Sequence, residues 1–340
     1  MNSPFLAPRA TMDDVARHAG VSKASVSRFI GEDRHLLSAG IAQRIEAAIT
    51  SLGYHPNQMA RGLKRGRTRL IGLLMADIRN PYSIAVMHGI ETACRQHGYS
   101  LVVCNTDRDP EQEDRQLQAL LAYNIEGLIV NTLGRHPEQL RALHGKVPVV
   151  LLDRKVEALG MDLVGLDNAA AVSLALEHLI ARGYQDLALI TEPPEGASSR
   201  GERCAAFEAC IGRVPGIRGQ VIGTGAGLPA ALATFLSEEK HGPRALFCAN
   251  GVAALAATHA LRTSGCQLFT DVGLIALDDL DWYPLVGSGI TALAQPTDAI
   301  GRMAFDCLLQ RLRGDLSPSR QIDLPGELVV RGSTPSRQLA

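Results

Sequence analysis

The chain has 340 residues, of which 46% are hydrophobic and 4% aromatic, and its formal net charge is −1. That length allows two or more domains and a large core. The charge is uneven, because residues 1–69 carry 11 Lys and Arg against 5 Asp and Glu (net +6), which leaves 23 against 30 (net −7) for the rest. A basic segment on an acidic body indicates a polyanionic partner for that segment, with an ordinary solvated basic face as the alternative.

Several classes of protein are excluded by what the sequence lacks. The seven cysteines are dispersed, without a CxxC pair or zinc spacing, and so predict reduced thiols and no metal site. No apolar run of signal-peptide length begins the chain, and no uncharged apolar span reaches 18 residues, so we expect a cytoplasmic protein without a membrane partner. The histidines form no HExxH and no serine lies in a G-x-S-x-G elbow, which argues against an enzyme and a cofactor.

Residues 11–30 predict two short helices joined by a tight turn, and a third helix follows. Thr11 is a suitable N-cap before an acidic first turn, Gly20 suits a left-handed turn, and Ser22 caps the second helix. The third helix has apolar residues at helical spacing, at Ile41, Ile45, Ile49 and Leu52. Residues 57–65 would form only one or two helical turns, too few to be stable alone.

From residue 70 the pattern changes to short apolar strands that alternate with helices. Strands such as LIGLLM are nearly all apolar, as a parallel sheet buried on both faces requires. The remaining 271 residues exceed one doubly wound sheet, so we expect two such lobes with a cleft between them. Strands are predicted at 70–76, 99–104, 126–131, 147–152, 163–166, 186–191, 219–223, 244–248, 271–276 and 290–293, and helices at 82–97, 110–123, 136–144, 168–182, 200–212, 227–240, 250–264 and 297–313.

The segment from Thr11 to Arg28, with its AGVS turn, resembles the DNA-binding head of the LacI/GalR family of repressors. The resemblance continues through YHPN, ARGL and LIG, which end at residues 57, 63 and 72, and then along the body. It implies an N-terminal all-α helix-turn-helix head, a hinge helix, and an α/β two-lobed, periplasmic-binding-protein-like (type I) core. The implied domains are the head at 1–55, the hinge helix and linker at 56–69, and the core at 70–340, with the first lobe at about 70–166 and 297–318 and the second at about 167–292 and 319–335.

In a helix-turn-helix, the N-terminal residues of the second helix meet base edges in the major groove. Here Lys23 and Arg28 can donate to guanine O6 and N7, and Ala24 offers a small apolar contact for a thymine methyl group. The serines of this helix are placed for phosphates, with capping or solvation as the alternative; they are Ser22, Ser25 and Ser27.

By the same resemblance, Asn57 to Lys64 form a hinge helix that pairs with its dimer partner in the minor groove. Leu63 would wedge between base pairs and kink the duplex. Arg61 and Lys64 would contact phosphates, and the motif also implies contacts from Asn57 and Ala60. A plain linker is the alternative.

The body resembles the sugar-sensing core of the family, with polar residues placed after strands or at helix starts, where open α/β sheets bind ligands. The positions that correspond to effector contacts in relatives are Tyr82, Asp153, Arg154, Ser199, Arg203, Asn250, Asp278 and Trp282. Their hydrogen-bonding groups suit a polyhydroxylated ligand, and the two arginines suit a carboxylate. The structural alternatives are an ion pair between lobes for Asp153 and Arg154, a helix start for Tyr82, and a dimer surface for Trp282.

Within the family, DIRNPYS, VCNTD and the KAS of the head most resemble repressors that respond to 2-ketogluconate, which implies this sugar acid as the inducer. No leucine-rich heptad helix follows VVRGS near the C-terminus, so we expect a homodimer, and two heads imply a palindromic double-stranded DNA operator. Closure of the cleft on the effector would separate the hinge helices. A corepressor role for the ligand and a neutral sugar as effector stay open as alternatives, whereas the basic head argues against a periplasmic sugar-binding protein.

Overall fold

The computed structural model describes residues 10–55, 67–156, 159–237 and 241–337. The chain divides between Thr68 and Arg69 into two compact units. Within these described ranges, no helix is both long enough and apolar enough to cross a membrane.

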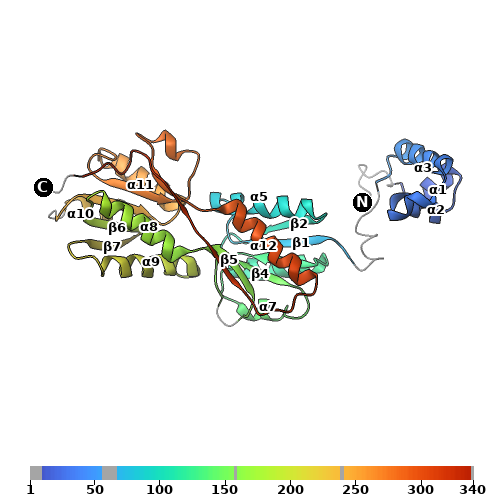
Figure 1. The fold of residues 1–340 in the computed structure, drawn as a ribbon, viewed down its shortest axis with the longest axis horizontal. Helices are drawn as coiled ribbons and strands as arrows, with labels where there is room; N and C mark the ends of the chain where they lie inside the picture. Colours follow the sequence, from blue (N-terminus) through green and yellow to red (C-terminus); the bar gives the residue numbers. More distant parts are fainter. Residues whose placement is uncertain (1–9, 56–66, 157–158, 238–240, 338–340) are drawn as a thin grey trace, which may run out of the picture. The chain divides into compact units, whose positions relative to one another are not determined.

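The smaller unit is a cluster of short helices (Figure 1). Thr11 caps the first helix as predicted, because its hydroxyl accepts a hydrogen bond from the Asp14 amide at 3.3 Å and the Asp14 carboxylate accepts one from the Thr11 amide at 2.9 Å. Gly20 ends this helix with a φ of 62°, a left-handed conformation that glycine adopts without strain. The elements are α1 (Met12–Ala19), α2 (Lys23–Ile30), the 3-10 helix η1 (Glu32–Leu36), which the sequence did not predict, and α3 (Ala39–Leu52).

A small apolar core joins these helices. It contains one fully buried residue from each main helix: Val15 of α1, Val26 of α2 and Ile45 of α3. Because Val26 faces this core, the residues on the other side of α2 are left to solvent.

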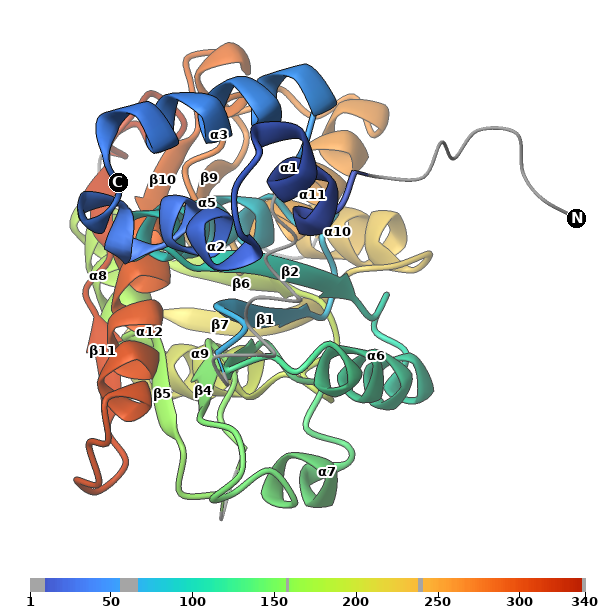
Figure 2. The same ribbon diagram turned by 90° about the vertical axis from the view of Figure 1, so that its right-hand side faces the viewer.

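The first lobe of the larger unit has a sheet in which neighbouring strands are parallel, in the order β11-β5-β4-β3-β1-β2. The strands are β1 (Leu70–Met75), β2 (Ser100–Asn105), β3 (Gly127–Val130), β4 (Val149–Leu152), β5 (Asp162–Leu166) and β11 (Gln321–Leu324). The helices of this lobe are α5 (Pro81–Gln96), α6 (Pro110–Ala122), α7 (Pro137–Arg141) and α12 (Thr297–Leu312), with α12 returning to it from late in the chain (Figure 2).

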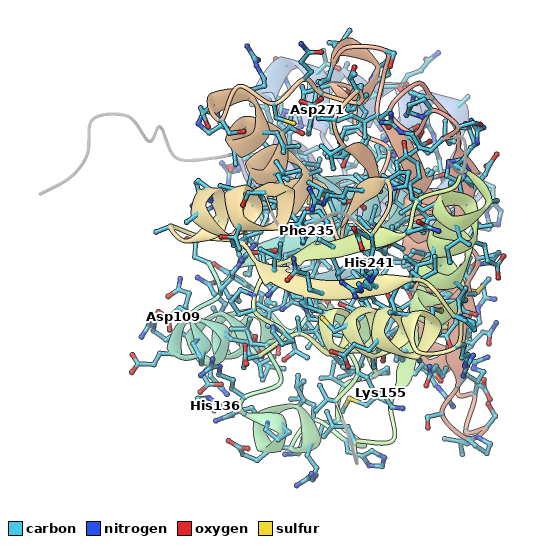
Figure 3. The ribbon with its side chains drawn as sticks, turned by 90° about the vertical axis from the view of Figure 1, so that its left-hand side faces the viewer. Asp109, His136, Lys155, Phe235, His241 and Asp271 are labelled. Atoms are coloured by element: carbon cyan, nitrogen blue, oxygen red, sulfur yellow. The ribbon has the colours of Figure 1, made fainter. Side chains whose placement is uncertain are left out.

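The second lobe has a sheet in the order β12-β10-β9-β8-β6-β7, and only the β10–β12 pairing is antiparallel in the part of the chain that the structure describes. Its strands are β6 (Asp186–Thr191), β7 (Arg218–Gly223), β8 (Arg244–Cys248), β9 (Gly273–Leu277), β10 (Thr291–Ala294) and β12 (Glu327–Val329). Its helices are α8 (Asn168–Ala181), α9 (Ser198–Ile211), α10 (Leu228–Ser237), α11 (Gly251–Thr263) and the 3-10 helix η2 (Tyr283–Leu285). Phe235 projects from α10 into the apolar core of this lobe (Figure 3).

The chain passes between the lobes at three short connections. Asp167 alone separates β5 from α8, residues 295–296 separate β10 from α12, and residues 325–326 separate β11 from β12. The prediction that 319–335 belong to the second lobe is therefore wrong for residues 321–324, since β11 pairs with β5 in the first sheet. The strand has the sequence QIDL, in which polar and apolar residues alternate, and this pattern does not indicate which sheet the strand joins.

Candidate functional site

The exposed side of α2 carries the residues predicted to read DNA. Lys23, Ala24 and Arg28 are all exposed, while Val26 on the opposite side is buried. The geometry of the helix thus presents two cations and one small apolar side chain to solvent, and their contacts with bases stay a prediction.

The serines of α2 differ in what they do within the head. Ser22 caps α2, because its hydroxyl accepts a hydrogen bond from the Ser25 amide at 3.2 Å and lies 3.0 Å from the Ser25 hydroxyl. Ser27 is exposed. The hinge positions Asn57, Ala60, Arg61, Leu63 and Lys64 lie outside the described residues.

A cleft in the larger unit brings together the predicted effector residues other than Trp282. It is lined by Asn80, Tyr82, Asp153, Arg154, Ala197, Ser199, Arg200, Arg203, Asn250, Asp278 and Gln295. These residues follow the ends of β1, β4, β8, β9 and β10 or begin α5, α9 and α11, as expected for parallel sheets that bind ligands at their carboxyl edges. Three lining residues were not predicted as effector contacts, namely Asn80, Arg200 and Gln295. Asn80 and Arg200 lie within two residues of a predicted contact, and Gln295 lies two residues after a predicted strand.

Arg203 is fixed deep in the cleft by the second lobe. Its Nε donates to Asn168 Oδ1 at 2.7 Å and its Nη1 donates to the Ala249 carbonyl at 2.9 Å. Its Nη2 lies 3.8 Å from Asp153 Oδ1 in the first lobe, and Asp153 Oδ2 accepts from the Ser199 hydroxyl at 3.2 Å. The predicted alternative of an ion pair between lobes is thus present for Asp153, with Arg203 as the partner.

Asp278 is held by the backbone and by one amide side chain. Its Oδ2 accepts from the Gly251 amide at 2.9 Å and its Oδ1 accepts from Gln295 Nε2 at 2.6 Å. Burial raises the pKa of Asp278, and these hydrogen bonds offset part of that increase. Asp278 and Asp153 have φ of 69° and 62°, a left-handed conformation that is uncommon for residues other than glycine and recurs at functional sites.

Several buried polar atoms of the cleft have no hydrogen-bond partner in the described ranges. They are Tyr82 Oη, Asp153 Oδ1, Arg154 Nε and Gln295 Oε1. Buried polar atoms are almost always hydrogen-bonded in proteins, so a set of them without hydrogen-bond partners around one cleft indicates groups that bind a polar ligand. Tyr82 is 6% exposed, and burial raises the pKa of its phenol well above the usual value, so it acts as a neutral hydrogen-bonding group.

Arg154 lines two hollows. The cleft has space of about 30 Å³ in this conformation, and a neighbouring hollow of about 270 Å³ shares Arg154 and Ala197 with it. Arg154 Nη1 donates to the carbonyls of Thr132 and Gly196, at 3.3 and 3.4 Å. These bonds are long and to neutral acceptors, and burial lowers the pKa of the guanidinium, so a carboxylate would be a better partner for it.

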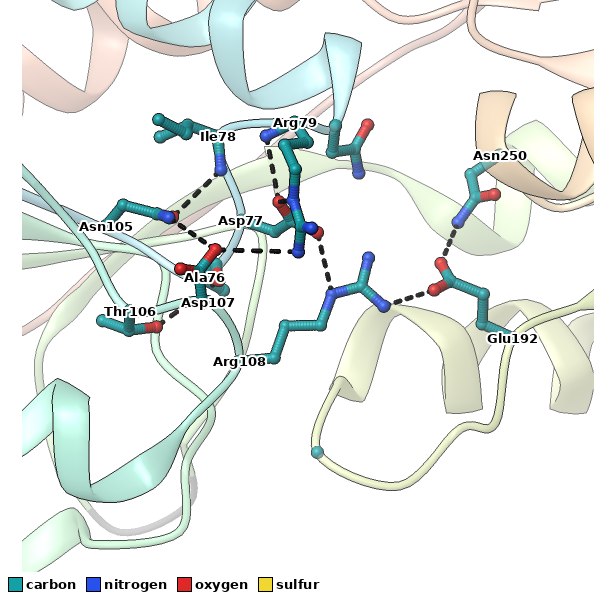
Figure 4. Close-up of polar contacts among 12 residues, drawn as sticks. Ala76, Asp77, Ile78, Arg79, Asn105, Thr106, Asp107, Arg108, Glu192 and Asn250 are labelled. Atoms are coloured by element: carbon teal, nitrogen blue, oxygen red, sulfur yellow. Dashed lines mark hydrogen bonds and ion pairs between the residues drawn. The ribbon is translucent and has the colours of Figure 1, made fainter. Parts of the chain in front are cut away.

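An ion-pair bridge joins the two lobes beside this cleft (Figure 4). Arg108, three residues after β2, lies with its Nε 3.2 Å from Asp77 Oδ2 in the first lobe and its Nη1 against Glu192 Oε1 in the second. Glu192 Oε2 accepts from Arg200 Nη2 and Asn250 Nδ2, each at 2.8 Å. Burial alone would raise the pKa of Glu192, but the hydrogen bond from Arg108 and the charge of Arg200 lower it.

This bridge between Arg108 and Glu192 was not predicted from the sequence. Glu192 directly follows β6, a position that the same rule on strand ends would have flagged. A polar residue after a strand does not reveal its partner in another lobe, and so the pairing itself had no sequence signal.

Trp282 does not line the cleft. Its ring packs edge-on against Tyr283, with centroids 4.6 Å apart and an interplanar angle of 86°, at the border of the core of the second lobe. The Tyr283 hydroxyl donates to the Leu277 carbonyl at 3.0 Å and holds this segment against the lobe. An effector contact from Trp282 stays a prediction. No group of His, Cys, Asp and Glu suited to a metal ion occurs among the residues the structure describes.

Comparison with known proteins gives consistent matches over both units. The family model described as "Bacterial regulatory proteins, lacI family" matches residues 11–57, and the model described as "Periplasmic binding proteins and sugar binding domain of LacI family" matches residues 68–330. The HTH-type transcriptional regulator PtxS of Pseudomonas aeruginosa is 64% identical over 329 residues, 97% of each chain. The HTH-type transcriptional regulator KdgR of Bacillus subtilis is 38% identical, over 95% of this chain and 97% of that protein.

A solved structure also resembles the whole chain. The lac repressor dimer bound to operator and the anti-inducer ONPF superposes with a TM-score of 0.82 at 27% identity, covering 96% of this chain and 99% of that one. The expected fold class, a helix-turn-helix head followed by a two-lobed α/β core, is confirmed by these matches.

Proposed function

Since the chain belongs to the LacI family of bacterial regulatory proteins and is a DNA-binding transcriptional repressor, not an enzyme, we propose that it binds a palindromic operator as a homodimer and is released by a sugar acid, 2-ketogluconate. The operator would be read by α2 in the major groove and by the hinge segment in the minor groove. The exposed cations Lys23 and Arg28 support the first part of this proposal.

The observation that carries the effector proposal is the set of buried polar atoms around one cleft that have no hydrogen-bond partner among the described residues. Tyr82, Asp153 and Gln295 offer hydrogen bonds to hydroxyl groups, and Arg154 offers a charged partner for a carboxylate. The named sugar acid follows the resemblance of three short stretches to 2-ketogluconate-responsive repressors. A neutral sugar would leave the Arg154 guanidinium without an anionic partner.

The proposed release couples the cleft to the hinge. A ligand that contacts both lobes favours one arrangement of them, and a hinge helix too short to be stable alone is sensitive to such a change. Reversal of operator occupancy from 99% to 1% requires about 5.5 kcal/mol of difference in ligand affinity between the two states. We therefore expect the ligand to release only part of the bound repressor.

Fluorescence anisotropy of a labelled palindromic duplex, at fixed and stated salt, tests the proposal. We expect 2-ketogluconate to weaken duplex binding and neutral hexoses to have no effect. The variant Arg154→Gln should lose this response, whereas Arg115→Gln, which removes an exposed guanidinium of α6, should retain it. Tightening of binding by the ligand would establish a corepressor instead, and a response to neutral sugars alone would refute the sugar-acid assignment.

A further inference from the structure

An ion pair lies within the proposed DNA-reading face of the head. Lys23 Nζ is 2.8 Å from Asp13 Oδ2, and both side chains are 58% exposed. Asp13 belongs to the first turn of α1 and Lys23 is the first residue of α2. The pair therefore ties the first helix of the helix-turn-helix to the start of the helix that would enter the major groove.

The chemistry of this pair bears on what Lys23 can bind. An ammonium on a four-carbon stem is a flexible point charge, and phosphate oxygens attract it wherever they lie. A carboxylate at hydrogen-bond distance offsets that charge, limits the rotamers of the lysine, and repels a phosphate that approaches it. Asp13 uses one of the three ammonium donors, so the others stay available to guanine O6 and N7.

We propose that Asp13 is a positioning residue for DNA specificity, which holds Lys23 toward a base edge and withholds it from the phosphates of unrelated DNA. This rests on the proposed function, in which α2 enters the major groove. Phosphate contacts strengthen binding to any sequence, whereas base contacts distinguish sequences. A head in which Lys23 is held by Asp13 thus gives up some affinity for unrelated DNA and keeps its affinity for the operator.

The head also contains a matched control. Arg34 Nη2 lies 3.6 Å from Glu46 Oε2, with the side chains 55% and 61% exposed, and this pair joins η1 to α3. The variant Glu46→Gln removes one negative charge from an exposed ion pair, as Asp13→Asn does, but away from the first turn of α2, and Arg34 keeps its contact over the Phe29 ring, 4.3 Å from the centroid. A general effect of charge on DNA binding would appear equally in both variants.

The experiment uses the full-length protein and a duplex that the wild type selects from a library of random sequences. Anisotropy then measures the affinity for this duplex and for a scrambled duplex of the same composition, over a series of salt concentrations, for the wild type, Asp13→Asn, Asp13→Glu and Glu46→Gln. Thermal unfolding followed by circular dichroism establishes that each head is folded.

We expect Asp13→Asn to bind the scrambled duplex about twofold to fivefold more tightly, the range that one exposed ion pair supports, with no equal gain on the selected duplex. The slope of log K against log salt on scrambled DNA should steepen by about 0.9 for each extra phosphate contact. Asp13→Glu should restore the wild-type ratio, and Glu46→Gln should leave that ratio unchanged. Equal ratios in Asp13→Asn and Glu46→Gln would overturn this inference alone, whereas a wild type that selects no sequence would overturn the proposed function with it.

Discussion

The variant Arg108→Gln removes one of the ion pairs that connect the two lobes and leaves the pair between Arg203 and Asp153 in place. Asp77 keeps Arg79, whose Nε lies 3.1 Å from its Oδ1, and Glu192 keeps its hydrogen bond from Arg200. No buried charge is therefore left alone, and we expect the free energy of unfolding to fall by no more than the contribution of the bridge itself, about 1–2 kcal/mol. The main effect should be on the balance between closed and open lobes.

The size of that effect follows from the exposure of the bridge. A hydrogen bond between charged groups is worth about 1.5–3 kcal/mol. Because the Arg108 side chain is 34% exposed, solvent screening reduces this to about 1–2 kcal/mol. A ligand that contacts residues of both lobes binds the closed arrangement, so loss of the bridge should weaken effector binding by about 5-fold to 30-fold.

Isothermal titration calorimetry with 2-ketogluconate measures this change, and Arg79→Gln is the matched control. Arg79 also contacts Asp77, but it lies within the first lobe and is 74% exposed, so its replacement should change the affinity by less than about twofold. Amide hydrogen exchange supplies a readout without ligand, since the segment around Glu192 should exchange faster only in Arg108→Gln. Unchanged or tighter binding in Arg108→Gln would refute the reasoning, because the bridge would then not favour the arrangement that binds ligand.

Three further outcomes are expected. Tyr82→Phe removes a buried hydroxyl that has no protein partner in the described residues, so effector affinity should fall about tenfold by calorimetry while the melting temperature stays unchanged. Burial alone would raise the pKa of Asp162, but hydrogen bonds from Arg311 and Arg320 lower it from 3.8 to about 2. Asp162→Asn should therefore lower the free energy of unfolding at pH 7 by about 2 kcal/mol. Since this folded-state pKa is depressed, urea unfolding at stepped pH should show the wild-type advantage above about pH 4 and its loss as the pH falls toward 2. Leu63→Ala, at a position outside the described residues, should weaken operator binding and reduce DNA bending in a gel-mobility assay without changing effector affinity, and unaltered bending would exclude the wedge.

The parts of the fold that depend on local chemistry were predictable from the sequence. The Thr11 cap, the left-handed Gly20 and the apolar strand β1 follow from side-chain hydrogen bonds, backbone freedom and burial on two faces, none of which requires knowledge of distant residues. For the same reason the cleft residues could be named, because strand ends are visible in the sequence and parallel strands place them on one edge.

The errors and omissions concern relations between distant segments. The pairing of Arg108 with Glu192 depends on how two lobes meet, and the placement of β11 depends on an edge strand that either sheet could accept. Trp282 was predicted to lie in the site because it is near Asp278 in the sequence, but in this structure it lies outside the lining of the cleft and packs beside the buried Tyr283. Proximity along the chain predicts that two side chains point the same way only within a regular helix or strand.

The connections between the lobes also govern the order in which the protein can be built. Because α12 and β11 belong to the first lobe yet lie after residue 296, that lobe is incomplete until the chain has left the ribosome as far as residue 324. The helices of the N-terminal head need only the first 55 residues and can fold long before, at the usual pace of synthesis of about 5–20 residues per second. A head that folds at that stage would be present for many seconds before the sensor proposed to control it, and the proposed pairing of two chains would keep it from occupying DNA prematurely.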